Sequence, residues 1–244
     1  CEMDYILEIA EQYKLKVVED SAQGVNAFYK DKALGTIGDF GTYSFHETKN
    51  YTMGEGGALL VRDEVNNIRS EIIREKGTNR AEFLLGMVDK YTWVSEGSSY
   101  LPSELSAAYL YGQLLEAEKI NTKRLEIYNC YFKHLKELED KEHIVLPVVP
   151  EHCKHNAHMF YLKARNIEER TRLIEYLKSN GVLSVFHYVP LHSAPFGLKC
   201  SRFCGEDIYT TNTSERLVRL PMYMDMTNKD AEYVSELIHS FYKG

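Results

Sequence analysis

The sequence predicts a layered α/β domain over residues 1–118, joined through a long helix to a smaller α+β domain over 119–244. In the first part, short apolar runs alternate with loops and helical patterns, which is typical of a sheet covered by helices. A helical periodicity then continues from Ser103 to about Leu138, long enough to lead from one domain into another. Beyond Pro150 the pattern returns to strands and helices over a shorter span, as expected for a second domain.

The first domain opens with apolar residues at helical spacing from Ile6 to Tyr13. The β-branched pair Val17 and Val18 then marks a short buried strand that ends in an acidic residue, Asp20. Further short apolar runs follow, separated by polar turns. The expected elements are a helix over 6–13, strands over 15–18, 40–46 and 59–61, and a helix over 64–74.

The linking helix is expected to begin at Ser103, because a serine caps a helix and the following Glu104 complements its first turn. In the second domain, the pair Asn180 and Gly181 stops a helix. The expected elements there are a strand over 159–164, a helix over 167–178, a strand over 182–187 and a closing helix over 230–242.

The composition is that of an ordinary globular protein. Of 244 residues, 44% are hydrophobic and 27% are charged, which excludes disordered, collagen-like and coiled-coil chains. Lys and Arg number 29 against 36 Asp and Glu, a net charge of −7. That balance argues against nucleic acid or an anionic membrane as the main partner, although a locally basic pocket for small anions remains compatible with it.

The cysteines and the absence of a membrane segment favour a cytoplasmic protein. Five cysteines without a CxxC pair argue against a disulfide framework, and no run approaches the roughly 18 apolar residues of a membrane span. The chain starts at Cys1 rather than Met, which is consistent with a fragment of a longer protein. The cysteines are Cys1, Cys130, Cys153, Cys200 and Cys204.

Two residues near strand ends are candidates for chemistry. Asp20 follows a buried strand, and ligands of open α/β sheets bind at the carboxyl ends of strands. Lys49 follows the second strand, where a lysine can become a nucleophile toward a carbonyl. Taken alone, each has a commoner structural role: Asp20 as a helix cap or turn residue, and Lys49 as an exposed loop lysine. The glycines at 54, 56 and 57 fit either a close approach to a ligand or a plain hairpin turn.

Together these residues indicate pyridoxal 5′-phosphate (PLP). PLP chemistry needs an amine that bonds the cofactor's aldehyde, a carboxylate that keeps its ring nitrogen protonated, and donors to its phosphate. Lys49, Asp20 and Ser44 supply these three groups in the required residue types.

Several stretches resemble, in order and spacing, the sugar aminotransferases of the DegT/DnrJ/EryC1/StrS family. The stretches at 19–23, 35–39, 44–50 and 54–57 carry the family resemblance. Others at 74–80, 89–93, 97–101 and 186–192 extend it over essentially the whole chain. The resemblance implies a PLP-dependent transferase of fold type I, aspartate aminotransferase-like, with a three-layer large domain and a smaller α+β C-terminal domain.

The resemblance also implies roles for individual residues. Lys49 would bind the cofactor covalently and move a proton at the substrate carbon, and Asp20 would pair with the pyridinium nitrogen. Gln23 would hydrogen-bond the phenolic oxygen of the ring, and Ser44 would contact the phosphate. A lysine at position 49 favours amino transfer, because related sugar dehydratases carry histidine there.

The implied reaction moves an amino group from L-glutamate to C4 of a dTDP-4-keto-6-deoxyhexose, in a cytoplasmic homodimer of surface-polysaccharide and lipopolysaccharide synthesis. A basic group after the third strand, Arg74, Lys76 and Arg80, could bind the diphosphate of the nucleotide sugar, although basic residues late in a helix more often complement its dipole. His187 and Tyr188 fall in a segment that lies near the cleft in the family, and interface or core positions are the alternative.

The sequence departs from the family in two places. Family members often have Asn and Arg where this chain has Ser99 and Leu101, so a cross-subunit phosphate contact by Ser99 is in doubt. They also begin with a stretch that holds a phosphate-binding turn and an aromatic residue that stacks on the cofactor. Nothing precedes Cys1 here, so we expect the N-terminal part of the large domain to be missing and this chain alone to have weak or no activity. The rival hypothesis is a non-catalytic folding or partner-binding module.

A group of histidines and cysteines invites a metal interpretation. Structural zinc sites pair closely spaced ligands, and the spacing of this group fits no such template, so we expect no metal site. The group consists of His152, Cys153, His155, His158, Cys200 and Cys204.

Overall fold

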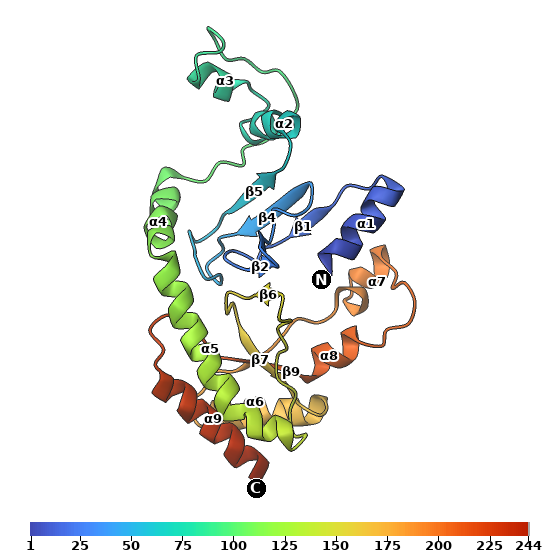
Figure 1. Ribbon diagram of the computed structural model, residues 1–244, viewed down its shortest axis with the longest axis vertical. Helices are drawn as coiled ribbons and strands as arrows, with labels where there is room; N and C mark the ends of the chain where they lie inside the picture. The colour runs from blue at the N-terminus through green and yellow to red at the C-terminus, as the bar shows by residue number, and fades with distance from the viewer. Residues whose placement is uncertain (244) are drawn as a thin grey trace. The chain divides into compact units, whose positions relative to one another are not determined.

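The computed structural model describes residues 1–243, which form two compact units (Figure 1). The first unit contains Cys1–Lys119 together with Pro150–Asn156, and the second contains Ile120–Val149 together with the residues from Ala157 onward. Both units combine helices with short strands, so the expected mixed α/β fold is confirmed. Among the described residues, no helix is long and apolar enough to cross a membrane.

The central sheet of the first unit has three strands in the order β1-β4-β5. Its middle strand, β4, pairs in parallel with β1, which places Asp20 opposite Thr42, and antiparallel with β5, which places Ser44 opposite Gly57. The parallel pair therefore brings the carboxyl ends of β1 and β4 to the same edge of the sheet. The bounds are β1 (Val18–Asp20), β4 (Phe40–Ser44) and β5 (Gly57–Val61).

A second, smaller sheet of the first unit has the order β3-β2-β6. Its strand β6 comes from residues 150–156, which the sequence analysis assigned to the second domain. Antiparallel pairing of Phe28 with Lys154 returns this segment to the first unit, a long-range contact that no local pattern indicates. The bounds are β2 (Phe28–Tyr29), β3 (Lys32–Ala33) and β6 (Cys153–Lys154).

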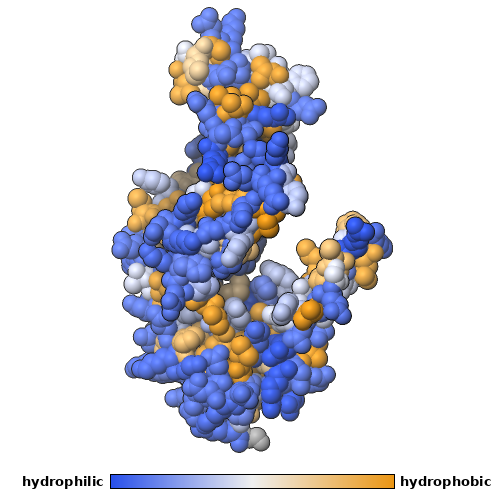
Figure 2. All heavy atoms as spheres, turned by 45° about the vertical axis from the view of Figure 1, so that its right-hand side comes forward, coloured by the Kyte–Doolittle hydropathy of each residue, from blue (hydrophilic) through white to orange (hydrophobic). Residues whose placement is uncertain are grey.

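Four helices complete the first unit, and two of them have side-chain caps, of which the sequence predicts the one at Ser103. The Asp63 carboxylate accepts a hydrogen bond from the Asn66 amide at 2.8 Å, and the Ser103 hydroxyl accepts one from the Ser106 amide at 3.1 Å. Figure 2 shows apolar side chains gathered around α3, at the top of the view, where Leu84 is 70% exposed. The bounds are α1 (Met3–Tyr13), α2 (Glu64–Arg74), α3 (Arg80–Leu84) and α4 (Glu104–Leu115).

The long helical stretch after Ser103 is two helices rather than one. Helix α4 ends at Leu115, because Glu116 adopts a non-helical backbone conformation with φ −99° and ψ 12°, and α5 (Ala117–Asp140) begins directly after it. Neither glycine nor proline marks this break, so the sequence pattern does not reveal it.

The second unit packs helices against an antiparallel sheet of order β7-β9-β8. Its elements are α5, β7 (Phe160–Lys163), α6 (Ile167–Ser179), β8 (Val185–Phe186), η1 (Leu191–Ser193), α7 (Gly197–Cys200), α8 (Thr210–Arg216), β9 (Leu217–Leu220) and α9 (Asn228–Lys243). One apolar cluster joins α5, β7, α6, β9 and α9, and its fully buried members include Ile127, Tyr131, Leu135, Phe160, Leu162, Leu173, Val218 and Ile238.

Candidate active site

Three of the predicted site residues lie at one edge of the central sheet. Asp20 is the last residue of β1 and Ser44 the last of β4, and parallel pairing sets these strand ends side by side. Lys49 stands in the connection that leaves β4 from this same edge (Figure 1). The side chain of Asp20 is exposed, and its Oδ1 accepts a hydrogen bond from the Ala22 amide at 3.2 Å. The carboxylate is thus held in a turn at the strand end, and its other oxygen has no hydrogen-bond partner among residues 1–243.

Lys49 extends from a closed loop between β4 and β5. The loop is closed at its base by the Phe45 amide, which donates to the Gly56 carbonyl at 2.8 Å, and by the Met53 amide, which donates to the Phe45 carbonyl at 2.9 Å. The Lys49 amide donates to the His46 carbonyl at 2.9 Å and completes a tight turn. Its side chain is half-buried and forms no hydrogen bond or ion pair with any other residue from 1 to 243. The backbone at Lys49 is therefore fixed, and its amine is available to a ligand.

The loop that carries Lys49 is fixed from behind by Tyr51. This side chain is only 1% exposed. Its hydroxyl accepts a hydrogen bond from Asn26 Nδ2 at 2.8 Å and donates one to the Ala117 carbonyl at 3.2 Å. The neighbouring Thr52 amide donates to Gln113 Oε1 at 2.9 Å. These contacts anchor the loop to the body of the first unit.

Asn156 ties the loop after β1 to the loop after β4. It is 5% exposed, and its Nδ2 donates to the carbonyls of Gln23 and Val25, both at 2.7 Å. Its own carbonyl accepts a hydrogen bond from Asn50 Nδ2 at 2.9 Å. One residue thus contacts both the Gln23 segment and the residue next to Lys49. Sequence reasoning missed it, since nothing in the local pattern sets this asparagine apart.

Glu19 is a second residue that the sequence analysis missed. Its carboxylate is buried and accepts three backbone hydrogen bonds, from the Ile37 amide at 2.6 Å, the Gly38 amide at 2.7 Å and the Gly35 amide at 2.8 Å. A charged group inside a protein needs such partners, and this one fixes the 35–38 loop against β1. The only available signal was an acidic residue in a strand pattern, directly before Asp20.

The 35–38 loop also lies directly against the middle strand. A Cβ on Gly41 of β4 would lie 1.9 Å from the Gly35 carbonyl oxygen, so no other residue fits there. The Tyr43 hydroxyl donates to the Leu34 carbonyl at 2.7 Å from the same strand. Burial, together with the Glu19 charge, raises the pKa of Tyr43, so it stays a neutral donor.

The other two predicted cofactor contacts have partners of their own. Ser44 is half-buried, and its hydroxyl accepts a hydrogen bond from the His46 amide at 3.3 Å, which leaves its own proton available to a ligand. Gln23 is exposed, and its backbone carbonyl is fixed by Asn156. The imidazole of His46 contacts Thr48 Oγ1 at 2.9 Å and Glu55 at 3.5 Å.

Residues 1–239 match the sequence profile of the DegT/DnrJ/EryC1/StrS aminotransferase family. The chain belongs to this family. It is 35% identical over 239 residues to the uncharacterized protein MJ1066 of Methanocaldococcus jannaschii. This alignment covers 94% of this chain and 61% of that protein. It is also 28% identical over 259 residues to SpsC, a spore coat polysaccharide biosynthesis protein of Bacillus subtilis. That alignment covers 100% of this chain and 64% of SpsC.

The structure is similar to that of Helicobacter pylori PseC, an aminotransferase involved in the biosynthesis of pseudoaminic acid. The TM-score is 0.88 at 18% identity, covering 100% of this chain and 64% of that chain. The likeness confirms the fold that the sequence predicts, that of PLP-dependent aminotransferases of fold type I. The chain spans less than two thirds of the length of these relatives.

In this DegT/DnrJ/EryC1/StrS family chain, the predicted basic group lies away from the edge that carries Lys49. Strand β5 is antiparallel to β4, so it ends at the opposite edge, and α2 and α3 follow from there (Figure 1). Each cation is already paired with an acid: Arg74 with Glu71 at 2.7 Å, and Arg80 and Lys76 with Glu75 at 3.1 and 3.5 Å. The structure does not bring these cations together with Asp20 and Lys49 in one chain.

His187 and Tyr188 lie in the second unit, directly after β8. The rings of the two residues are 4.6 Å apart, and Tyr188 is 73% exposed. Nδ1 of His187 is buried and has no hydrogen-bond partner among the described residues. Burial, with the nearby charge of Arg219, lowers the pKa of His187 and keeps the imidazole neutral.

Proposed function

We propose that this chain carries the catalytic lysine of a PLP-dependent sugar-nucleotide aminotransferase. The reaction would move an amino group from L-glutamate to C4 of a dTDP-4-keto-6-deoxyhexose and form dTDP-4-amino-4,6-dideoxygalactose. The observation that supports the proposal is that Asp20 and Ser44 end two parallel strands at one edge of the sheet, and that the Lys49 loop leaves β4 from the same edge. A non-catalytic module would need no such arrangement.

The residues present fit the cofactor. When bound, PLP supplies an aldehyde and a protonated ring that draws electrons from the bonds of the substrate. The donor set at the sheet edge matches these needs: an exposed carboxylate at Asp20, and, among the residues that the structure describes, an amine at Lys49 without a competing partner and a hydroxyl at Ser44 whose proton is not donated. Members of the family depend on PLP, and solved structures of this fold include PLP and PMP forms.

The family resemblance implies a role for each residue, and the position of each residue supports it. The Asp20 carboxylate would hold a proton at the ring nitrogen, and the Ser44 hydroxyl would donate to the phosphate. Gln23, exposed beside them, donates to the phenolic oxygen. Lys49 moves a proton at the substrate carbon, since its amine is attached to a loop that backbone hydrogen bonds close. Its tether to the sheet edge limits the distance over which that proton travels.

The nucleotide sugar is supported by resemblance and by relatives. SpsC belongs to spore coat polysaccharide biosynthesis and PseC is involved in the biosynthesis of pseudoaminic acid, and both support a role of this chain in sugar biosynthesis. For this chain we propose lipopolysaccharide and enterobacterial common antigen synthesis in the cytoplasm, and a homodimer. In a dimer, the basic residues Arg74, Lys76 and Arg80 and the pair His187 and Tyr188 would be the candidates for binding the nucleotide sugar.

Cofactor labelling tests the proposal directly. The chain is incubated with PLP, reduced with borohydride and digested, and the labelled lysine is identified by mass spectrometry. We expect stoichiometric label on Lys49, no label at this peptide in Lys49→Arg, and normal label in Lys32→Arg, a matched change of an exposed lysine. Label spread over several surface lysines, or none on Lys49, would refute the proposal and favour the non-catalytic module.

A second measurement tests the substrate. Consumption of L-glutamate with dTDP-4-keto-6-deoxyhexose is followed for the chain and for a version extended to the length of its relatives. We expect Asp20→Asn and Lys49→Arg to abolish turnover in the active form. Equal rates with UDP- and dTDP-linked keto sugars would overturn the nucleotide assignment alone, since the label on Lys49 reports the cofactor chemistry separately.

A further inference from the structure

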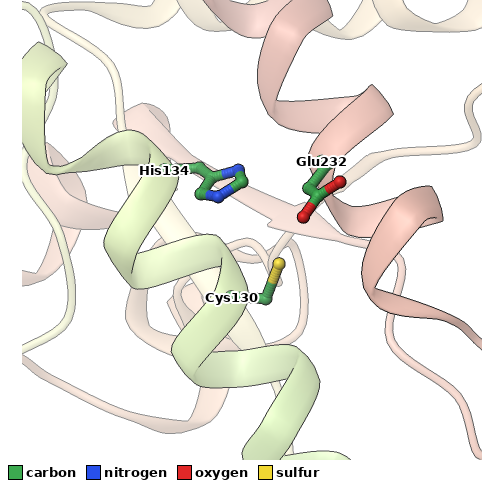
Figure 3. A group of neighbouring side chains, drawn as sticks. All are labelled: Cys130, His134 and Glu232. Atoms are coloured by element: carbon green, nitrogen blue, oxygen red, sulfur yellow. The ribbon is translucent and has the colours of Figure 1, made fainter.

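The second unit holds a cluster of metal-ligating side chains far along the chain from the residues discussed above. Cys130 and His134 belong to α5, and Glu232 belongs to α9. One ligand atom from each, the sulfur, a ring nitrogen and a carboxylate oxygen, lies within 4.8 Å of the other two. Figure 3 shows the three side chains directed into the same gap between the helices. We propose that they bind one Zn²⁺ ion.

The backbone places these groups in register. Residues four apart on a helix share a face, so Cys130 and His134 project side by side from α5. Glu232 faces them from α9 because its neighbours Ala231 and Val234 are buried in the core on which both helices pack. A nitrogen of the His239 ring and the His134 carbonyl oxygen form a further contact between the helices at 2.8 Å. The spacing of the two helices is thus set without the metal.

The distances suit a tetrahedral ion after small rotations. Zinc bonds of about 2.0–2.3 Å hold neighbouring ligand atoms about 3.5 Å apart. The three atoms here lie somewhat wider, within 4.8 Å, and all three side chains are half-buried, which leaves room for rotation about side-chain bonds. Three protein ligands leave a fourth position for water. Binding of an ion would therefore bring the three ligand atoms closer together.

The donor set selects the kind of ion. A thiolate, an imidazole and a carboxylate suit Zn²⁺ and similar borderline-soft cations, whereas Mg²⁺ and Ca²⁺ prefer oxygen ligands alone. Two negative ligands also balance the charge of a divalent cation. In this structure the Cys130 thiol donates to the Asn228 carbonyl at 3.6 Å. Binding of the ion would displace the thiol proton. The expected result is a link between α5 and α9 on the surface of the second unit.

This site differs from the metal interpretation that the sequence invites. The histidines and cysteines weighed there stand between 152 and 204, and Cys153 belongs to β6 of the first unit. Among residues 1–243, the group formed by Cys130, His134 and Glu232 is the one whose ligand atoms converge. Glu232 stands far from the other two in sequence, which is why no spacing template finds it.

The test is a titration of the metal-free chain with Co²⁺ and Zn²⁺. Bound Co²⁺ reports a cysteine ligand through a sulfur-to-metal absorption band, and calorimetry with Zn²⁺ gives stoichiometry and affinity. We expect one equivalent of Zn²⁺ per chain, the cobalt band in the wild type, and a higher Tm with Zn²⁺ than without. Cys130→Ser and Glu232→Gln should weaken Zn²⁺ binding by more than about tenfold, the lower limit for losing even an outer partner of a metal ligand.

Cys200→Ser is the matched control, because Cys200 is exposed and lies outside the cluster. It should keep the cobalt band, the affinity and the Tm shift of the wild type. The Tm of each variant without metal shows that it is folded. Absence of a cobalt–thiolate band in the wild type, or a band that persists in Cys130→Ser, would overturn the proposal. Loss of the band in Cys200→Ser would do the same.

Discussion

Replacing Glu19 by glutamine should destabilise the first unit although the shape of the side chain is kept. The carboxylate accepts hydrogen bonds from three backbone amides, at 2.6, 2.7 and 2.8 Å, and it is 8% exposed. A glutamine carbonyl can still accept from the Ile37 and Gly38 amides, but its NH₂ group then faces the Gly35 amide, donor against donor. One unsatisfied donor and the loss of charge from two other bonds cost about 2–4 kcal/mol.

Hydrogen exchange measures this cost where it arises. Since about 1.4 kcal/mol corresponds to a factor of ten, peptides covering residues 35–38 should exchange about 30- to 1,000-fold faster in Glu19→Gln than in the wild type. Glu55→Gln is the control, because the Glu55 side chain is 86% exposed and its partner His46 lies 3.5 Å away. Unchanged protection of the 35–38 amides, or an equal effect of Glu55→Gln, would refute the assignment of Glu19 as the group that holds this loop.

Three further changes test other parts of the structure. Asn156→Ala removes two side-chain hydrogen bonds and should lower the free energy of unfolding by about 1–3 kcal/mol, measured in urea, together with a weaker affinity for PLP. Gly41→Ala should fail to fold in the first unit, seen as loss of its hydrogen-exchange protection, because the new Cβ meets the Gly35 carbonyl at 1.9 Å. Burial opposes ionisation of Glu169, but hydrogen bonds from Arg165 and Tyr242 prevail and lower its pKa below the ordinary 4.5. Its contribution to stability is therefore complete above pH 4.5 and lost below it, so the difference in Tm between the wild type and Glu169→Gln should shrink as the pH falls through that range.

The parts of the site that could be predicted are those that local patterns encode. The strand patterns before Asp20 and Lys49 indicate two strand ends, and the rule that ligands bind at the carboxyl ends of strands brings them together. Parallel pairing of β1 with β4 gives that rule its physical basis here. The helix start at Ser103 follows equally from the local capping preference.

What could not be predicted depends on contacts between distant segments. Asn156 meets Asn50 and Gln23 across separations of 106 and 133 residues, and its segment joins the first unit only because β6 pairs with β2. The break between α4 and α5 at Glu116 likewise has no glycine or proline that would indicate it in the sequence. The convergence of Glu232 on Cys130 arises from the packing of α9 on α5 and from no motif.

The hydrogen bonds behind the candidate site explain how the loops at an exposed edge of a small sheet are fixed. Glu19 and Asn156 bond mainly to backbone atoms, so they fix the path of the loops and leave the side chains of Asp20, Ser44 and Lys49 open to a ligand. The two contacts of Asn156 are also distinct in kind. Its side chain donates to the Gln23 carbonyl, whereas its backbone carbonyl accepts a hydrogen bond from the Asn50 side chain. Loss of the Asn156 side chain therefore frees the loop that follows Asp20, while the loop that carries Lys49 keeps its hydrogen bond. Positioning of the carboxylate and of the amine is therefore separable in this fold.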